Sequence, residues 1–454
     1  MISAIRTAIE RTLIFSIAAV YIVLQAAGLD ELVFLMGGLV FAAILLLLPR
    51  LKGMTRWLTV FFLAAGVMLL SIQQADARTW FESAGINVTI VTLFLFAPLF
   101  GIPVRIPRYV EALKRFYEAS LRSKTALFLG TQLLTQIMGV FINVGSIPVV
   151  YQMVFVRPLP GMSQLLANAM NRGFAGAILW SPYFAAMTLV TSSLGLSWSS
   201  VLPYMLGLAV LSLAISWAVD WRELRQAEVE DAEPGQSADA KERAAFPYGL
   251  ALYLAAAIIV ILVLERLIEL PMVLLICLAA AAFPLCWCLT LGAWRVYREG
   301  LRNHVAVTLP ALQKEITLFL AAGFFSGSIG ATDFGSKVPG WLEIVPLPMA
   351  ITFSLLAILL IAGTSLIGLH PIVPVTLLAG GIDPASVGIG PVYFAVLLLG
   401  GWALSNPISP ASAVNNLLSG LLGKSVFEMA APNYKYAAFM GLGLIVYLLV
   451  ALGG

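Results

Sequence analysis

The chain has 454 residues, of which 61% are hydrophobic and only 11% charged, and its formal net charge is +3. This composition indicates a polytopic membrane protein and excludes an ordinary water-soluble domain. The small charge, spread over several loops, argues against a nucleic-acid partner. Cys277, Cys286 and Cys288 lie in one apolar run without a second ligand pair. We therefore expect no metal site, no disulfide and no organic cofactor.

A membrane-spanning helix needs about 20 apolar residues, and this length predicts eleven spans. The N-terminal apolar stretch follows Arg6 and Arg11 but lacks a small-residue cleavage site, so we expect an uncleaved first span. The expected spans are 11–27, 31–49, 56–72, 87–102, 173–195, 200–219, 248–265, 271–291, 314–331, 391–421 and 436–452.

Two further apolar stretches, 125–156 and 349–380, are too long for one helix and are interrupted by NVGSIP and GLHPIVP. Backbone that leaves the helix at membrane depth is tolerated only where it is buried or lines a wet cavity. Each stretch therefore predicts a re-entrant hairpin whose tip faces a binding site. The candidate tip residues are Asn143, Gly145 and Ser146 in the first hairpin and Thr364, Ser365 and His370 in the second.

Lys and Arg favour cytoplasmic loops, and with eleven crossings every basic or mixed-charge loop falls on one side. This predicts a multi-pass protein of the inner (plasma) membrane with a cytoplasmic N-terminus and with Gly454 outside. The hairpin at 125–156 then enters from the inside and the hairpin at 349–380 from the outside. Residues 103–124 predict an amphipathic interfacial helix, either a plain linker or an arm that supports the first hairpin.

The two halves of the chain repeat one order of elements: three spans, a hairpin, an interrupted span and a closing span. Opposite hairpin orientations make this an inverted repeat, which is typical of secondary transporters. The mixed-charge linker is expected to be solvated and cytoplasmic. The predicted parts are an extra span at 1–30, a first repeat at 31–220, the linker at 221–246 and a second repeat at 247–454.

Both interrupted spans contain a Ser-Pro pair, in LWSPYFAAMT at 179–188 and PISPASAVNN at 407–416. A helix broken at the midplane exposes N–H groups and carbonyls that can hold an anion or a cation. Neutral polar side chains beside the break can replace part of the hydration shell of a bound ion. The alternative is that these small polar residues only hold neighbouring helices together. The candidate ligands are Ser181 in the first break and Ser405, Asn406, Ser409, Ser412 and Asn415 in the second.

The chain has two histidines. His370, at a hairpin tip beside Pro371, is a candidate to carry a proton or hold an anion, the alternative being a structural hydrogen bond. His304, beside Arg302, is expected to be solvated in a cytoplasmic loop. Arg172 is expected either to meet a carboxylate or to extend to the cytoplasmic interface.

Four segments resemble the divalent-anion:sodium symporters and their citrate, arsenite and antiporter relatives in the ion transporter superfamily. LFLGTQLLTQIMGVFINVGSIPVVYQMV at 127–154 and ITFSLLAILLIAGTSLIGLHPIVPVTLLAG at 351–380 are similar to that family's two hairpins. KEITLFLAAGFFSGSIGATDFGSKVPGWL at 314–342 is similar to its span before the second hairpin, and WALSNPISPASAVNN at 402–416 to its interrupted helix. The family's Ser-Asn-Thr signature is absent at both tips. The resemblance implies a homodimer with a fixed scaffold and a moving transport domain, working as an elevator.

Together these features predict a secondary active transporter, not an enzyme, that moves a small anion or carboxylate-like organic acid through the bilayer, coupled to protons or sodium. A cation/proton antiporter is one alternative, but the predicted spans contain almost no carboxylates. An arsenite-type exporter is another. A membrane enzyme of glycan assembly would need long outer loops rich in catalytic residues, and the outer loops are short.

Overall fold

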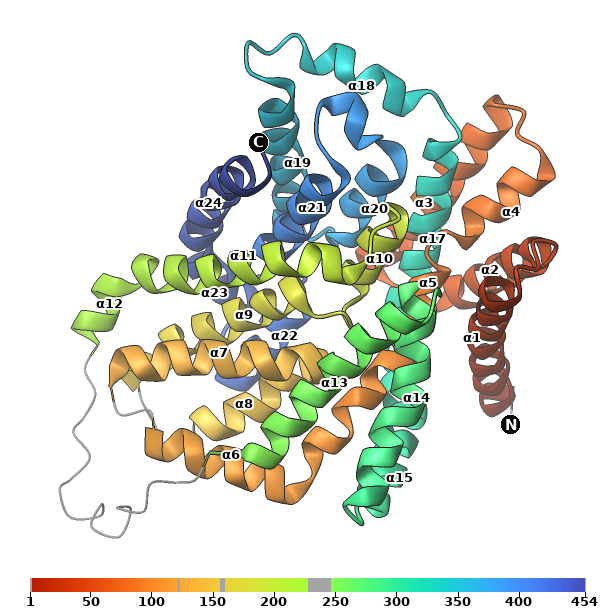
Figure 1. The fold of residues 1–454 in the computed structure, drawn as a ribbon. Helices are drawn as coiled ribbons and strands as arrows, with labels where there is room; N and C mark the ends of the chain where they lie inside the picture. The colour runs from red at the N-terminus through yellow and green to blue at the C-terminus, as the bar shows by residue number, and fades with distance from the viewer. Residues whose placement is uncertain (1, 121–122, 156–159, 228–245, 454) are drawn as a thin grey trace, which may run out of the picture.

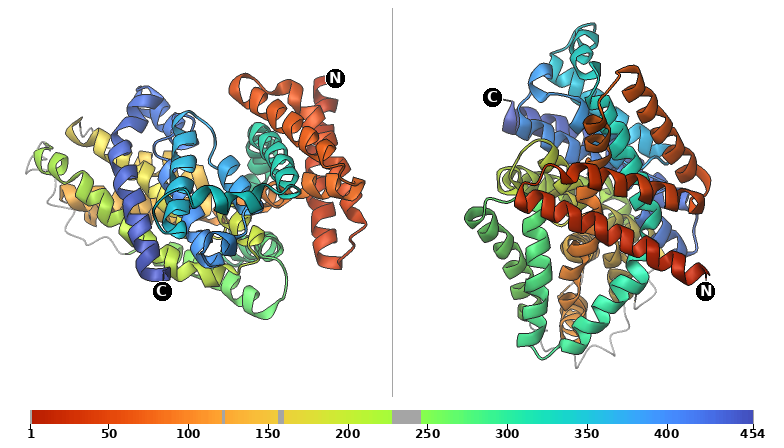
Figure 2. Two further views of the ribbon diagram at one scale, coloured as in Figure 1. Left: turned by 90° about the horizontal axis from the view of Figure 1, so that it is seen from above. Right: turned by 90° about the vertical axis from the view of Figure 1, so that its right-hand side faces the viewer.

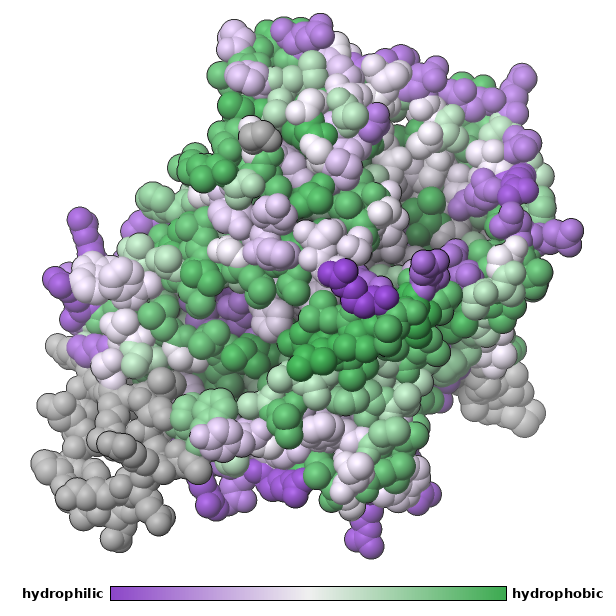
Figure 3. Space-filling view, viewed as in Figure 1, coloured by the Kyte–Doolittle hydropathy of each residue, from purple (hydrophilic) through white to green (hydrophobic). Residues whose placement is uncertain are grey.

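The computed structural model describes residues 2–120, 123–155, 160–227 and 246–453, and in these ranges every regular element is a helix (Figure 1). Eleven of the described helices are long and apolar enough to cross a membrane, or twelve if one bent pair is a single span. Figure 3 shows hydrophobic side chains over much of the middle of one face, with hydrophilic ones at its upper and lower ends, at its flanks and at a few central positions. The predicted all-α polytopic membrane protein is confirmed.

The number of spans agrees with the prediction, but their identities differ in part. The apolar runs include Lys124–Val154 and Met349–Leu366, which hold arms of the predicted hairpins, and the expected span at 87–102 belongs to a longer run, Ala77–Arg105. The unbroken long helices are α1 (Ile2–Ala27), α2 (Leu32–Leu47), α3 (Gly53–Ile72), α11 (Trp198–Val219), α13 (Tyr248–Leu267), α14 (Met272–Thr290) and α24 (Tyr434–Leu452).

Both predicted hairpins are present as helix–turn–helix units. In the first, α7 (Lys124–Ile142) ends in the turn η4 (Asn143–Gly145), and α8 (Ser146–Val154) returns in contact with α7 (Figure 1). In the second, α19 (Met349–Leu366) turns at Gly368 into α20 (Ile372–Gly381). Asn143 has a φ of +50° and Gly368 one of +86°, so each chain reversal uses backbone that continues neither helix nor strand. Their opposite orientation in the membrane stays a prediction, as do the repeat boundaries.

Both interrupted spans are broken where the Ser-Pro pairs predict. The first consists of α9 (Ser163–Trp180) and α10 (Ala185–Ser193), and the second of α21 (Pro391–Ser405) and α22 (Ala413–Leu422). Every residue of α9 from Leu165 to Leu179 is buried, because the helix packs against α7, α11 and α21. This helix therefore lies at the centre of the molecule.

Arg172 fixes α9 to its neighbours. Its fully buried guanidinium forms an ion pair of 2.8 Å with Asp220, which follows α11. Its Nε also donates to Oδ1 of Asn433 at 2.8 Å, and its charge lies 4.8 Å from the ring centre of Tyr436 in α24. Of the two expectations for this arginine, contact with a carboxylate is the one observed.

A bent helix follows α14. It consists of α15 (Trp294–Asn303), the π-helical turn η7 (His304–Thr308), the short α16 (Leu309–Ala311) and α17 (Gln313–Gly330), and the two long parts meet at 59°. The remaining elements are α4 (Ala77–Gly85), α5 (Val88–Phe96), η1 (Leu48–Arg50), η2 (Ala97–Gly101), η3 (Pro103–Arg105), α6 (Pro107–Ser120), α12 (Trp221–Gln226), η5 (Pro160–Met162), α18 (Phe334–Leu342), η8 (Pro384–Val387), α23 (Val426–Ala430) and η9 (Ala431–Asn433). Figure 2 shows the N-terminal helices on one flank, where α2, α3 and α4 pack against α17.

The amphipathic helix predicted at 103–124 is α6, which buries Tyr109, Leu113 and Tyr117. The hydroxyl groups of Tyr117 and Thr131 lie 2.7 Å apart, so α6 is bonded directly to the first hairpin. This contact favours the supporting arm over the plain linker. Most of the linker predicted at 221–246 lies outside the described residues.

Candidate functional site

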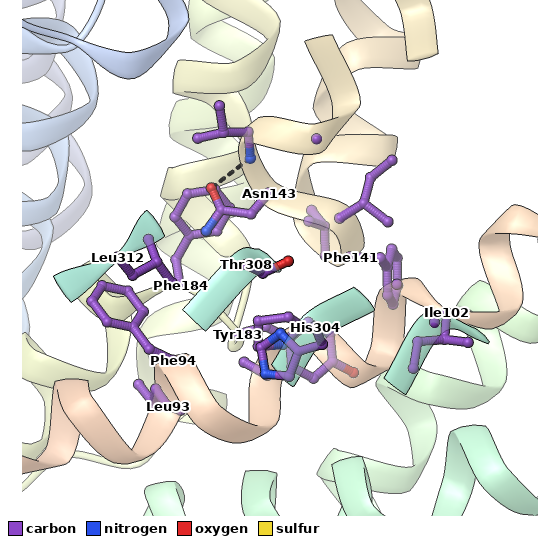
Figure 4. A pocket seen from close by; sticks show the side chains of 18 of the residues that line it. Leu93, Phe94, Ile102, Phe141, Asn143, Tyr183, Phe184, His304, Thr308 and Leu312 are labelled. Carbon is purple, nitrogen blue, oxygen red and sulfur yellow. Dashed lines mark hydrogen bonds between the residues drawn. The ribbon is translucent and has the colours of Figure 1, made fainter. Parts of the chain in front are cut away.

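A cavity of about 290 Å³ lies at the tip of the first hairpin. Its walls come from the hairpin tip, the break between α9 and α10, the end of α5 with η2 and η3, and the bent helix at η7 (Figure 4). Three of these walls, namely the hairpin tip, the break and the bent helix, interrupt a regular α-helix. Irregular backbone at such a position is expected to line a functional cavity.

The hairpin tip presents an amide to the cavity. The Oδ1 atom of Asn143 accepts a hydrogen bond of 2.7 Å from the N–H of Val144, and the Nδ2 group bonds to no other described residue (Figure 4). Ser146 is buried behind the tip, where its hydroxyl donates to the carbonyl of Asn143 at 2.8 Å. The structure therefore brings Asn143 and Gly145 to the cavity, with Ser146 as a brace.

Ser181 braces the opposite wall. Its buried hydroxyl donates to the carbonyl of Val140 in α7 at 3.0 Å and accepts from the N–H of Tyr183 at 3.2 Å. The residue does not line the cavity itself, but the next residues along the break do. Ser181 thus ties the break in the first interrupted span to the arm of the hairpin.

Arg105, at the end of η3, brings a positive charge to the cavity. A Cβ atom added to Gly145 would lie 3.8 Å from its Nη2 atom, so the guanidinium approaches the hairpin tip closely. It forms no hydrogen bond or ion pair with another described residue, and it lines the cavity. Sequence reasoning did not separate Arg105 from the other basic loop residues, because its position beside the tip depends on how η3 packs against the first hairpin.

His304 is the second group that sequence reasoning missed. Its side chain is buried, its Nε2 lies 2.9 Å from the carbonyl oxygen of Leu95, and its Nδ1 is buried without a partner among the described residues. The expectation that His304 is solvated in a cytoplasmic loop is wrong. The π-helical turn and the 59° bend carry the chain back against α5, and such turns are frequent at functional sites.

Aromatic rings cover much of the remaining wall. Phe94, Phe141, Tyr183 and Phe184 line the cavity, and the Tyr183 hydroxyl is already used in a bond of 3.0 Å to the carbonyl of Ala257. Among the residues that line the cavity there is no Asp or Glu. The cavity thus combines an apolar wall with an arginine, an amide and a histidine.

The polar residues of the second break satisfy one another. Asn415 is fully buried, and its Nδ2 group donates to the carbonyls of Pro407 at 2.9 Å and Ser409 at 2.8 Å. Its N–H donates to the Ser412 hydroxyl at 3.1 Å. Ser405 donates to the carbonyl of Trp402 at 2.8 Å. These candidates do not line the cavity, and their role as ligands stays a prediction.

Asn406 differs from its neighbours, because its Oδ1 is buried without a partner among the described residues. At the second hairpin tip, Ser365 is likewise buried with an unpartnered hydroxyl, whereas Thr364 donates to the carbonyl of Leu360 at 2.6 Å. None of the three lines the cavity at the first tip. Their proposed contacts with a substrate or ion also stay predictions.

His370 caps the start of α20 in the second hairpin. Its Nδ1 accepts a hydrogen bond of 3.2 Å from the N–H of Ile372, and its ring centre lies 5.1 Å from that of Phe319 and 5.7 Å from that of Trp402. Phe319 in turn lies 5.9 Å from Phe94 in the cavity wall. A row of rings therefore runs from the cavity to His370, which does not line it.

No protein-family model and no curated protein sequence matches the chain. Among solved structures it is similar to the YdaH transporter of Alcanivorax borkumensis, with a TM-score of 0.55 and 17% identity over 87% of this chain and 98% of YdaH. It is also similar to MtrF of Neisseria gonorrhoeae, described within a class of antimetabolite efflux pumps, with a TM-score of 0.49 and 15% identity over 87% and 95% of the two chains. The likeness to YdaH shows that the chain has a transporter's fold. Membership of the divalent-anion:sodium symporter family stays a prediction.

Proposed function

We propose that the protein is a secondary active transporter that carries a small organic anion with an apolar body across the inner membrane. The cavity at the first hairpin tip carries this proposal. It holds the Arg105 guanidinium, which bonds to no other described residue, and no carboxylate lines it. A carboxylate substrate would pair with this guanidinium, and the surrounding rings would cover its apolar part.

The walls of the cavity also suit transport. A hairpin tip, a broken helix and a bent helix can each shift relative to the unbroken helices around them, which is how a bound substrate becomes exposed to the other side. We infer an elevator-type movement of the hairpins and interrupted helices within a homodimer, coupled to protons or sodium. A cation/proton antiporter is less well supported, because a cation finds no carboxylate among the residues that line the cavity.

Thermal unfolding of the purified protein tests the substrate class. Benzoate carries the anionic group and the ring that the cavity predicts, and benzamide keeps the shape without the charge. A ligand that binds the folded state stabilises it by about 2.7 kcal/mol at 100 times its dissociation constant. We expect benzoate to raise the melting temperature and benzamide to leave it unchanged. Equal effects of the two compounds would contradict an anion site.

Arg105→Gln should abolish the benzoate effect while the protein alone still melts near the wild-type temperature, since the side chain is exposed. Arg108→Gln is the matched control. Arg108 is also exposed, lies 5.3 Å from the ring centre of Tyr109 and does not line the cavity. Uptake of radiolabelled benzoate into proteoliposomes should show the same difference between the two variants. An Arg105→Gln protein that still responds to benzoate would place the anion elsewhere.

A further inference from the structure

We propose that His304 takes up a proton on Nδ1 when the anion binds, so that it is the proton carrier of the transport cycle. This inference rests on the proposed function, because it needs an anion in the cavity. The two ring nitrogens of His304 differ in their contacts. Nε2 contacts the carbonyl of Leu95 at 2.9 Å, while Nδ1 is buried and has no partner among the described residues.

The contact with Leu95 decides which nitrogen carries the proton in the neutral ring. A carbonyl oxygen only accepts hydrogen bonds, so Nε2 must be the donor. Nδ1 then bears a lone pair, in a ring that forms part of the cavity wall. A carboxylate oxygen beside this lone pair would be repelled by it, because both atoms can only accept a hydrogen bond. Protonation turns Nδ1 into a charged donor, and the contact becomes a charge-assisted hydrogen bond.

The charged groups around the ring make proton uptake depend on the anion. Among the residues that line the cavity, the charged or titratable ones are Arg105 from η3, Tyr183 from the first break and His304 itself. Tyr183 donates to the Ala257 carbonyl. On the histidine's own bent helix, the side chains of Arg298, Glu299 and Arg302 are exposed. Because both residues line one cavity, an imidazolium there without an anion would add a second positive charge to that of Arg105, which like-charge repulsion disfavours.

Proton uptake and proton release are balanced over one transport cycle. A proton from water binds Nδ1 as the carboxylate binds between His304 and Arg105, and no covalent bond to the substrate forms. On the other side of the membrane the carboxylate leaves, the repulsion from Arg105 returns, and Nδ1 releases its proton to water. One proton thus accompanies each carboxylate, and the affinities for the two are coupled reciprocally.

His370 provides an internal comparison, since the chain has two histidines. Its Nδ1 already accepts the N–H of Ile372, and the residue does not line the cavity. One conservative variant of each histidine can keep the hydrogen bond that its ring makes to the backbone. In His304→Gln, the side-chain amide can still donate to Leu95 from the position of Nε2. In His370→Asn, the side-chain oxygen can still accept from Ile372 at the position of Nδ1.

Nitrogen NMR of protein labelled with ¹⁵N-histidine, in lipid nanodiscs, tests the proposal directly. Two sets of ring signals are expected, and each variant removes one and so assigns it. In the absence of ligand at pH about 7.5, His304 should show a protonated Nε2 and a bare Nδ1. Benzoate at the same pH should convert His304 to the doubly protonated form and leave His370 unchanged.

Proton uptake, followed with a pH indicator in weakly buffered solution, gives the second measurement. Wild type and His370→Asn should take up close to one proton per benzoate bound at pH about 7.5. His304→Gln should take up none while melting near the wild-type temperature. Benzoate binding without proton uptake, or a resting His304 with its proton on Nδ1, would overturn the inference and leave the anion site intact. If benzoate neither binds nor stabilises the wild type, the proposed function fails, and the coupling fails with it.

Discussion

Asn171 in α9 donates a hydrogen bond of 2.6 Å to the side-chain oxygen of Asn415 at the start of α22, joining two interrupted spans 244 residues apart. Both side chains are buried. Because Asn415 uses both of its Nδ2 protons on the carbonyls of Pro407 and Ser409, it holds the second break in shape. Much of the polarity in this segment therefore stabilises the interruption that the prolines create.

Asn415→Ala should destabilise the protein by roughly 2–4 kcal/mol, because it leaves two carbonyls and the Asn171 amide buried without partners. Asn416→Ala is the matched control, since that exposed side chain makes one bond to the Ser412 carbonyl one turn earlier. Chemical or thermal unfolding in detergent measures both. If the two variants unfold alike, Asn415 does not hold the break and its predicted role as a ligand gains weight.

Replacing Arg172 by Met should cost about 3–5 kcal/mol, because Asp220 would remain as an unpaired buried charge. The pair formed by Arg78 and Glu82 offers the contrast. Its ionic groups lie 2.6 Å apart on one helix, but the two side chains are 52% and 49% exposed. Glu82→Gln should therefore change the unfolding free energy by less than about 0.5 kcal/mol. A mild effect of Arg172→Met would mean that other groups compensate Asp220.

Gly173→Ala should disrupt the contact between α9 and α7. A Cβ atom at this position would lie 2.4 Å from the Gln132 carbonyl oxygen and 2.8 Å from the Thr135 Cβ. Gly420, in α22, has nothing within 4 Å of the same atom, and Gly420→Ala should be neutral or slightly stabilising. Yield and melting temperature of the two variants give the comparison, and a well-folded Gly173→Ala protein would show that the two helices can separate.

Labelling with a membrane-impermeant thiol reagent in intact cells tests the topology. In a variant without the native cysteines, a cysteine at Asp383 should react and one at Gln236, in the predicted cytoplasmic linker, should not. Permeabilised cells, in which both positions must react, provide the control. Reaction at Gln236 in intact cells would refute the inverted-repeat arrangement and the predicted external Gly454.

Much of the architecture could be predicted from the sequence because proline, glycine and asparagine mark both hairpin turns and both helix breaks locally. Pro182, Pro407 and Pro410 lie in the two observed breaks, and Asn143 lies in the first hairpin's turn. The cavity could not be predicted in the same way. His304 reaches it through a π-helical turn next to Pro310, in a segment without polar interruption-type residues. The site assignment from polar residues at the hairpin tips and helix breaks therefore omitted it.

The burial of α9 has a consequence for how the chain enters the bilayer. The run Ser163–Ser193 has the lowest mean hydropathy of the eleven candidate spans, and α9 carries Asn168, Asn171 and Arg172. An arginine at the centre of an isolated span costs about 2.5–3.5 kcal/mol during insertion. This segment should therefore move from the translocon into the bilayer only when later helices are present to pair with its polar side chains. Since its partners Asp220, Asn415 and Asn433 are all synthesised afterwards, the centre of the molecule is completed last.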